Sequence, residues 1–150
     1  MLTVHMLIGI PGSGKTTFAN KFSKEKNIPI VSTDVVRKLN PVWDEKNVWP
    51  EVYRLCGEHL KNNEDFIFDA TNVTPKVRKR FFDQLSVYNV EFDTIAYFFD
   101  TDFEVCYERV VARNKNNDEH YIPVDVVASY SQTIIPPTKE EGFKDIIILK

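Results

Sequence analysis

The 150-residue sequence predicts an α/β fold in three layers, in which helices cover both faces of a mostly parallel five-stranded sheet. Two observations predict it. Short apolar runs of strand length alternate with helical segments from one end of the chain to the other. A glycine-rich segment, residues 9–17, lies between the first apolar run and the first helical segment, where a strand is expected to turn into a helix.

The composition limits the class of protein. Hydrophobic residues make up 43% of the chain, which excludes a disordered protein and is enough for the core of one domain spanning residues 1–150. The net charge of −3 provides no general attraction to nucleic acids or acidic membranes. There are two cysteines and no apolar run of about 18 residues, so we expect a cytoplasmic protein with no membrane partner.

The glycine-rich segment matches the phosphate-binding pattern G-x-x-x-x-G-K-[ST] at every fixed position. Its glycines let successive N–H groups converge on a phosphate chain. Lys15 can reach the β- and γ-phosphates, and the Thr16 hydroxyl can bind Mg²⁺. A dinucleotide fingerprint is excluded because Thr17 stands where it needs a third glycine. The predicted ATP-binding residues here are Gly9, Pro11, Gly12, Ser13, Gly14, Lys15, Thr16 and Thr17.

The elements on either side of this loop support the pattern. The apolar residues 4–8 predict a buried strand, and residues 15–25 predict a helix that carries Phe18 and Phe22 four positions apart. A strand, a glycine loop and a helix N-terminus together form an anion site. The sequence therefore predicts a nucleoside triphosphate site.

Asp34 is predicted to lie where a second strand, residues 28–31, gives way to a helix, residues 35–39. Open α/β sheets bind ligands at this edge. Arg37 follows three positions later and can share a helix face with Asp34. The alternative is that Asp34 caps the helix and Arg37 is its surface ion-pair partner.

The next predicted helix, residues 48–61, is preceded by a loop and lies in an aromatic-rich stretch. Trp43, Trp49 and Tyr53 could stack nucleic acid bases, although such residues more often pack within a fold.

Residues 65–69 predict a third strand that ends at Asp69 and resembles a Walker B strand, whose terminal carboxylate orders magnesium. Ala70 follows, where motor ATPases usually carry a water-activating Glu, so the site is not built for hydrolysis. Pro75 begins a helix whose polar face carries Lys76, Arg78, Lys79 and Arg80. This face is either solvated or a phosphate-binding patch.

The last third of the chain adds a strand over 92–99, a helix over 103–113, a helix from Pro123 to about 133, and a final buried strand over 146–149. Arg109 and Arg113 are i, i+4 neighbours that project together. The polar residues 114–121 are typical of a lid, which we place at roughly 109–122. Residues 114–118 miss the guanine motif N-K-x-D by one position, which argues against a GTPase.

Taken together, Asp34-x-x-Arg37, Asp69-x-Thr71-Asn72 and the two lid arginines resemble P-loop kinases, above all the kinase domain of bacteriophage-type polynucleotide 5′-hydroxyl kinases. The resemblance runs from residue 7 to residue 143. It implies a P-loop NTPase fold with strand order 2-3-1-4-5 and a helical lid. The chain departs from the family at Val110, where Asn is common, and in a longer stretch between Arg113 and Pro123.

The resemblance also implies roles for individual residues. Asp34 would be the general base, Arg37 would hold an acceptor phosphate, Arg113 would contact the transferring phosphate, and Arg109 would accompany it in binding ATP. Lys15, Asp34 and Arg113 form the expected catalytic set, and Thr16 and Asp69 the expected magnesium site. The expected acceptor-binding residues are Asp34, Arg37, Asp69, Thr71, Asn72 and Arg78.

The function expected from the sequence is Mg²⁺-dependent transfer of the ATP γ-phosphate to the 5′-OH of DNA or RNA. One alternative keeps this chemistry but uses a small acceptor, such as a nucleoside, a sugar or an antibiotic. Another alternative is a nucleotide-binding regulatory module with little or no turnover.

Overall fold

The computed structural model describes residues 1–115 and 121–150. Five strands in these residues form one sheet in the order β2-β3-β1-β4-β5, and every neighbouring pair is parallel. The strands are β1 (Thr3–Ile8), β2 (Ile30–Ser32), β3 (Phe66–Asp69), β4 (Asp93–Phe99) and β5 (Asp145–Leu149). The predicted fold class and strand order are confirmed.

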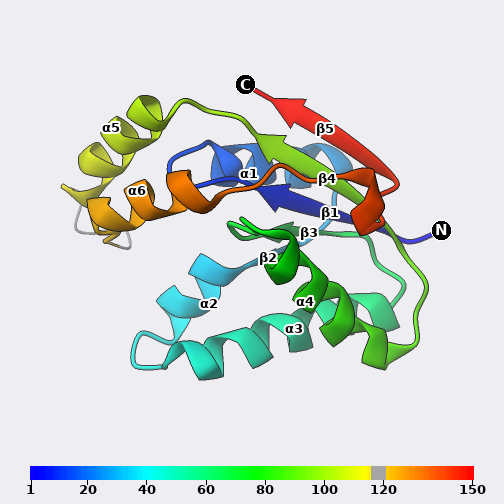
Figure 1. Ribbon diagram of the computed structural model, residues 1–150. Coiled ribbons are helices and arrows are strands. Elements are labelled where there is room, and N and C mark those ends of the chain that lie inside the picture. Colours follow the sequence, from blue (N-terminus) through cyan, green and yellow to red (C-terminus); the bar gives the residue numbers. More distant parts are fainter. Residues whose placement is uncertain (116–120) are drawn as a thin grey trace.

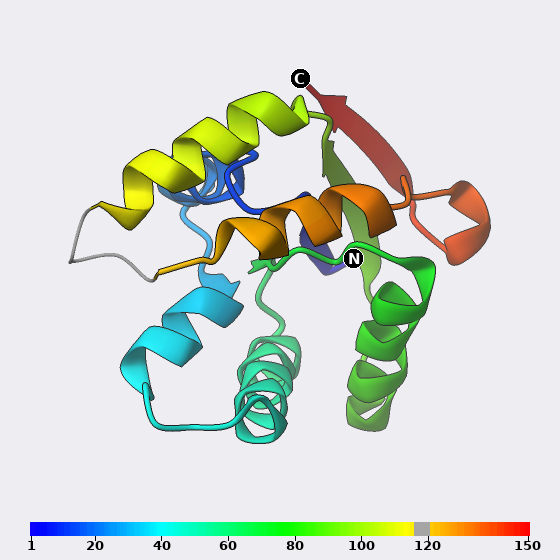
Figure 2. The same cartoon turned by 60° about the vertical axis from the view of Figure 1, so that its left-hand side comes forward.

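Helices cover both faces of this sheet (Figures 1 and 2). The α-helices are α1 (Lys15–Lys26), α2 (Thr33–Leu39), α3 (Glu45–Lys61), α4 (Pro75–Leu85), α5 (Phe103–Asn114) and α6 (Val124–Thr133). Two short 3₁₀ helices, η1 (Ser86–Tyr88) and η2 (Lys139–Glu141), follow α4 and α6. None of the helices in the described ranges is long and apolar enough to cross a bilayer.

The central strand β1 shows why three layers form. Val4, Met6 and Ile8 point to the face covered by α3 and α4 and belong to the largest core cluster. Leu7 points to the opposite face and packs with Ala19 of α1. Because β1 is buried on both faces, it is a nearly continuous apolar run rather than an alternating one. A third cluster joins α5 to α6 through residues such as Val110 and Val127.

The strands point toward the end of the sheet where α2, α5 and α6 gather (Figure 1). Parallel strands have their carboxyl ends at one edge, so the segments that leave β1, β2, β3 and β4 all begin there. This edge is where an open α/β sheet binds ligands.

Two predictions about the outer elements are wrong. The final strand is not buried: β5 lies at the edge of the sheet, where it pairs only with β4, and the Ile148 side chain is 61% exposed. Helix α3 begins at Glu45 rather than at residue 48, because the Asp44 carbonyl already accepts the N–H groups of Asn47 and Val48. The earlier start places Glu45 in a helical turn beside α2, where its carboxylate contacts Arg37.

Candidate functional site

The loop between β1 and α1 has the conformation that its glycines predict. Gly12 and Gly14 have φ angles of 83° and 103°, in the left-handed region that favours glycine. A Cβ atom on Gly12 would lie 2.6 Å from the carbonyl oxygen of Cys106, so the loop also needs glycine for its contact with α5. Gly14 is the N-cap of α1, and the N-terminus of that helix therefore faces the loop.

Neighbouring segments hold this loop in place from two sides. The Gly9 N–H donates to the Thr71 carbonyl at 3.0 Å, which ties the loop to the segment after β3. The Thr101 hydroxyl donates to the Ser13 carbonyl at 2.9 Å, and the Arg109 guanidinium donates to the Gly12 carbonyl at 3.0 Å. The loop is therefore preorganised for a phosphate chain.

Lys15 lies at the start of α1 with its side chain buried. Its Nζ donates to the Ile10 carbonyl at 3.0 Å, which keeps the ammonium group against the loop. Burial lowers the pKa of Lys15, while the carboxylates of Asp69 and Asp34 act in the opposite direction. The cation is thus placed where a phosphate chain would replace its protein contacts.

Thr16 and Asp69 bring two oxygen ligands together. The Thr16 hydroxyl donates to Asp69 Oδ2 at 3.3 Å. Burial raises the pKa of Asp69, and the Lys15 cation opposes this shift. Hydroxyl and carboxylate oxygens suit Mg²⁺, which keeps several water ligands and commonly binds one or two protein groups together with substrate phosphates. The described ranges contain no cluster of three His, Cys, Asp or Glu residues able to hold a metal, so a magnesium ion here would depend on the nucleotide as well.

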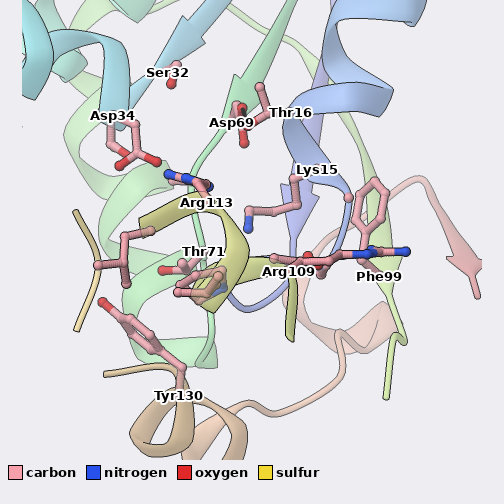
Figure 3. A pocket seen from close by; sticks show the side chains of 18 of the residues that line it. Lys15, Thr16, Ser32, Asp34, Asp69, Thr71, Phe99, Arg109, Arg113 and Tyr130 are labelled. Carbon is pink, nitrogen blue, oxygen red and sulfur yellow. Dashed lines mark hydrogen bonds between the residues drawn. The ribbon is translucent and has the colours of Figure 1, made fainter. Parts of the chain in front are cut away.

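A cavity of about 1230 Å³ opens beside the loop (Figure 3). Its wall comes from the phosphate-binding loop, helices α1, α2, α5 and α6, the start of α3, and the ends of β3, β4 and β5. Pockets for drug-sized ligands usually measure about 300–1,000 Å³, so this cavity is larger than most.

Asp34 lines this cavity from the first turn of α2. It is not the helix cap, contrary to one interpretation of the sequence, because Ser32 is the N-cap and its hydroxyl accepts the Val35 N–H at 3.3 Å. The other part of that interpretation is correct, since Arg37 donates to Asp34 Oδ1 at 3.0 Å. Capping by Ser32 leaves the Asp34 carboxylate available to the cavity.

Glu45 also lines the cavity, although the sequence did not indicate a role for it. Its carboxylate accepts two hydrogen bonds from Arg37, at 3.0 Å from Nε and at 2.7 Å from the NH2 nitrogen. The only signal in the sequence was an acidic residue eight positions after Arg37, in a stretch predicted to be loop.

Arg109 and Arg113 project from α5, and both line the cavity. In Figure 3 the Arg113 side chain extends between Asp34 and Lys15. Its positive charge acts on both Lys15 and Asp69, which places it within electrostatic range of the loop and of the carboxylate that ends β3. A nucleotide phosphate in the loop would therefore face cations from two separate elements.

Residues 116–120 of the predicted lid, 109–122, lie outside the described ranges. They include part of the stretch 114–118, which nearly matches the guanine motif. Asn114 joins the two ends of this lid segment. Its side-chain amide donates to the Ile122 carbonyl at 2.7 Å and accepts the Ile122 N–H at 2.9 Å. This clamp fixes the distance between the end of α5 and the start of α6.

Two residues expected to bind the acceptor lie outside the cavity wall, while Thr71 and Asp69 are part of it. Asn72 is 2% exposed, has a φ of 48°, and donates to the Leu7 carbonyl at 2.8 Å. Arg78 is fully buried, so its predicted place on a solvated or phosphate-binding face is wrong. Its guanidinium pairs with Glu141 and donates to the carbonyls of Asn72 and Ile135.

The three aromatic residues considered for base stacking do not form one surface. Trp49 lines the cavity, but the cavity wall includes neither Trp43 nor Tyr53. The ring centroids of Trp49 and Tyr53 are 5.7 Å apart, and both side chains pack against the core. This favours the packing interpretation for Tyr53 and leaves Trp49 as the one aromatic residue of the three that a ligand in the cavity could meet.

Known proteins resemble this chain in sequence or in fold. A family model described as an AAA domain matches residues 4–137. No curated protein matches the sequence. A putative kinase from Chloroflexus aurantiacus J-10-fl superposes with a TM-score of 0.81 at 16% identity, over 99% of this chain and 87% of that one. A gluconokinase from Sinorhizobium meliloti 1021 gives 0.62 at 15% identity, over 98% and 81%.

A chain of the Pnkp1/Rnl/Hen1 RNA repair complex gives a TM-score of 0.76 at 24% identity, over 88% of this chain and 43% of that one. At these identities the likeness establishes the fold and leaves the acceptor open. A phosphate-binding loop, a parallel sheet in the order 2-3-1-4-5 and the match over most of the sequence agree with one another. The chain therefore belongs to the family of this AAA domain and has the fold of a P-loop kinase.

Proposed function

We propose that this protein is an ATP-dependent kinase that transfers the γ-phosphate to the 5′-OH of a DNA or RNA strand. The observation that carries the proposal is the Asp34 carboxylate, which lines the same cavity as Lys15 and Arg113. A carboxylate facing the phosphate-binding loop from a separate helix is suited to receive a proton from an acceptor hydroxyl.

In this mechanism the phosphate-binding loop and the N-terminus of α1 hold the nucleotide phosphates. Lys15, Arg109 and Arg113 offset the negative charge that develops during transfer. A magnesium ion held by Thr16 and Asp69 together with the nucleotide would add charge neutralisation. The acceptor oxygen forms a bond to the γ-phosphorus, the bond to the β–γ bridging oxygen breaks, the hydroxyl proton passes to Asp34, and ADP leaves.

The position after Asp69 supports transfer over hydrolysis. Ala70 is 5% exposed and has no side chain able to activate water. Asp34, by contrast, lines the cavity from α2, an element separate from the phosphate-binding loop and from β3. This arrangement favours a kinase over an ATPase or a silent nucleotide-binding module.

The fold relatives support two acceptors. The likeness to a chain of an RNA repair complex supports a nucleic acid end, and the likeness to a gluconokinase supports a small hydroxylated molecule. One observation specifically favours the second candidate: Glu45 already occupies the guanidinium of Arg37, the residue expected to hold an acceptor phosphate.

The test is transfer of γ-labelled phosphate from ATP and Mg²⁺ to 5′-OH oligonucleotides, with nucleosides and sugars in parallel. We expect label on the oligonucleotide that is lost in Lys15→Ala and falls by about 10³-fold in Arg113→Ala, by analogy with arginine fingers. Oligonucleotides that already carry a 5′-phosphate are the negative control. Label on small molecules alone would mean that the acceptor is a small molecule rather than a nucleic acid. No label on any acceptor would overturn the kinase proposal.

A further inference from the structure

Arg37 lines the cavity and is held between two carboxylates from different helices, Asp34 of α2 and Glu45 of α3. Its Nε and NH2 groups donate to both oxygens of Glu45, and its NH1 group donates to Asp34. The Arg37 side chain is 27% exposed, and that of Glu45 is 61% exposed. The pair lies at the open side of the cavity rather than in the core.

The planar fork of an arginine matches a carboxylate and a phosphate equally well. Glu45 therefore occupies the geometry that a phosphate of an incoming molecule would use. The group of Arg37, Asp34 and Glu45 carries a formal charge of −1, and it would become neutral if Glu45 lost its charge, which would favour an anion at Arg37.

Glu45 is also placed so that it can leave. It lies in the first turn of α3, directly after the loop that joins this helix to α2. Since most of its side chain is exposed, the carboxylate can turn into water without leaving a buried charge. Arg37 would then offer two N–H groups to a new ligand while Asp34 still holds the third nitrogen.

We propose that Glu45 is a specificity-determining residue, which competes with a phosphate of the acceptor for Arg37 and so sets how strongly the site prefers acceptors that carry a phosphate beside the reacting hydroxyl. This inference rests on the proposed function for the identity of the acceptor. The charge of the Glu45 side chain would limit this preference.

The test uses calorimetric titration of the full chain with ADP and Mg²⁺ at saturation, so that phosphate groups cannot enter the phosphate-binding loop. The probes are adenosine 3′-monophosphate and adenosine. In Glu45→Gln, which keeps the shape and removes the charge, we expect affinity for the monophosphate to rise about three- to tenfold and affinity for adenosine to stay unchanged. In the double variant Glu45→Gln/Arg37→Ala the gain should disappear.

The matched control is Glu51→Gln. Glu51 forms the same two-point contact with Arg54, at 2.6 and 2.9 Å, on the same helix but outside the cavity wall. The Glu51→Gln substitution should leave the affinities for the monophosphate and for adenosine unchanged. An unchanged or weaker affinity for the monophosphate in Glu45→Gln would overturn the inference, because Glu45 would then only support Arg37.

The two proposals fail in different ways. If Glu45→Gln does not alter monophosphate binding but the protein phosphorylates 5′-OH ends, the inference about Glu45 is wrong and the proposed function stands. If binding shifts as expected but no acceptor is phosphorylated, the competition for Arg37 is real and the proposed reaction is wrong.

Discussion

Two arginines of this protein are bound by glutamates in nearly the same way and differ in almost everything else. Arg78 pairs with Glu141 at 2.7 and 3.2 Å, and Arg37 pairs with Glu45 at 3.0 and 2.7 Å. Arg78 is fully buried, whereas Arg37 is 27% exposed at the cavity. The remaining partners of Arg78 are backbone carbonyls, and the remaining partner of Arg37 is a second carboxylate.

The difference shows that the surroundings of an arginine–glutamate pair decide its use. Arg78 joins the segment after β3 to Ile135 and Glu141, which lie 57 and 63 residues after Arg78, so it fixes the course of the chain. A buried pair that loses one partner leaves an unpaired charge in the core. A pair at a cavity can exchange one partner for a ligand at small cost.

The largest difference between the cavity and the buried Arg78–Glu141 pair should appear when a charge of the cavity alone is removed. We expect Asp34→Asn to lower turnover by about 10²–10⁴-fold, since a positioned base contributes that much, while the unfolding midpoint in urea stays close to that of the parent protein. The control is Asp83→Asn on α4, which also pairs with a nearby basic residue, Lys79, but lies outside the cavity wall. Near-normal turnover in Asp34→Asn would contradict the role of this carboxylate.

The next prediction concerns stability. Glu141→Ala should lower the free energy of unfolding by about 3–5 kcal/mol, because it leaves the Arg78 guanidinium buried without its counter-charge. Glu45→Ala should lower it by under about 1 kcal/mol. Urea denaturation measures both, with the exposed neighbour Glu140→Ala as a control. Equal losses in Glu141→Ala and Glu45→Ala would remove the distinction between the two pairs.

The buried pair should also respond to pH. Burial alone would raise the pKa of Glu141, but hydrogen bonds from Arg78 and from the Thr138 backbone lower it overall, below its ordinary value of 4.5. A carboxyl with a lowered pKa in the folded state stabilises that state above its unfolded pKa and ceases to do so as pH falls through the folded pKa. The stability difference between the parent protein and Glu141→Gln should therefore be full at neutral pH and shrink below about pH 4.5. A difference that is constant down to pH 3 would contradict this.

The smallest expected effect is that of salt on the exposed pair. Arg37→Ala should change the free energy of unfolding by under about 1 kcal/mol in dilute buffer, and by less in 1 M NaCl, where surface charges are screened within about 3 Å. Thermal unfolding at the two salt concentrations measures this. A loss in Arg37→Ala that matched the one in Glu141→Ala, at either salt concentration, would mean that Arg37 is structural as well.

The sequence was most informative where local chemistry determines local structure. The glycine loop and the alternation of strands and helices predicted the fold, the loop and the position of Lys15, because turn geometry and burial on both faces of a sheet leave direct marks on composition. The start of α4 at Pro75 was predicted correctly, because Pro favours the first helical position.

The sequence was least informative about contacts between distant segments. Arg78 was placed on a polar helix face because its neighbours Lys76, Lys79 and Arg80 are polar, and nothing near it indicates that Glu141 lies against it. Glu45 was missed for the same reason, since its importance comes from the position of α3 beside α2. Such pairings depend on how the chain returns on itself, which the spacing of residues does not encode.

The long reach of Arg78 also has a practical consequence for how this unit can be excised. The family match ends at residue 137, four positions before Glu141 and ahead of β5. A fragment cut at that point would keep the phosphate-binding loop, Arg109 and Arg113, yet it would leave the buried Arg78 guanidinium without its carboxylate and expose the outer edge of β4. A boundary taken from similarity alone should therefore give a less stable and more aggregation-prone fragment that still carries the phosphate-binding loop, Asp34 and Arg113.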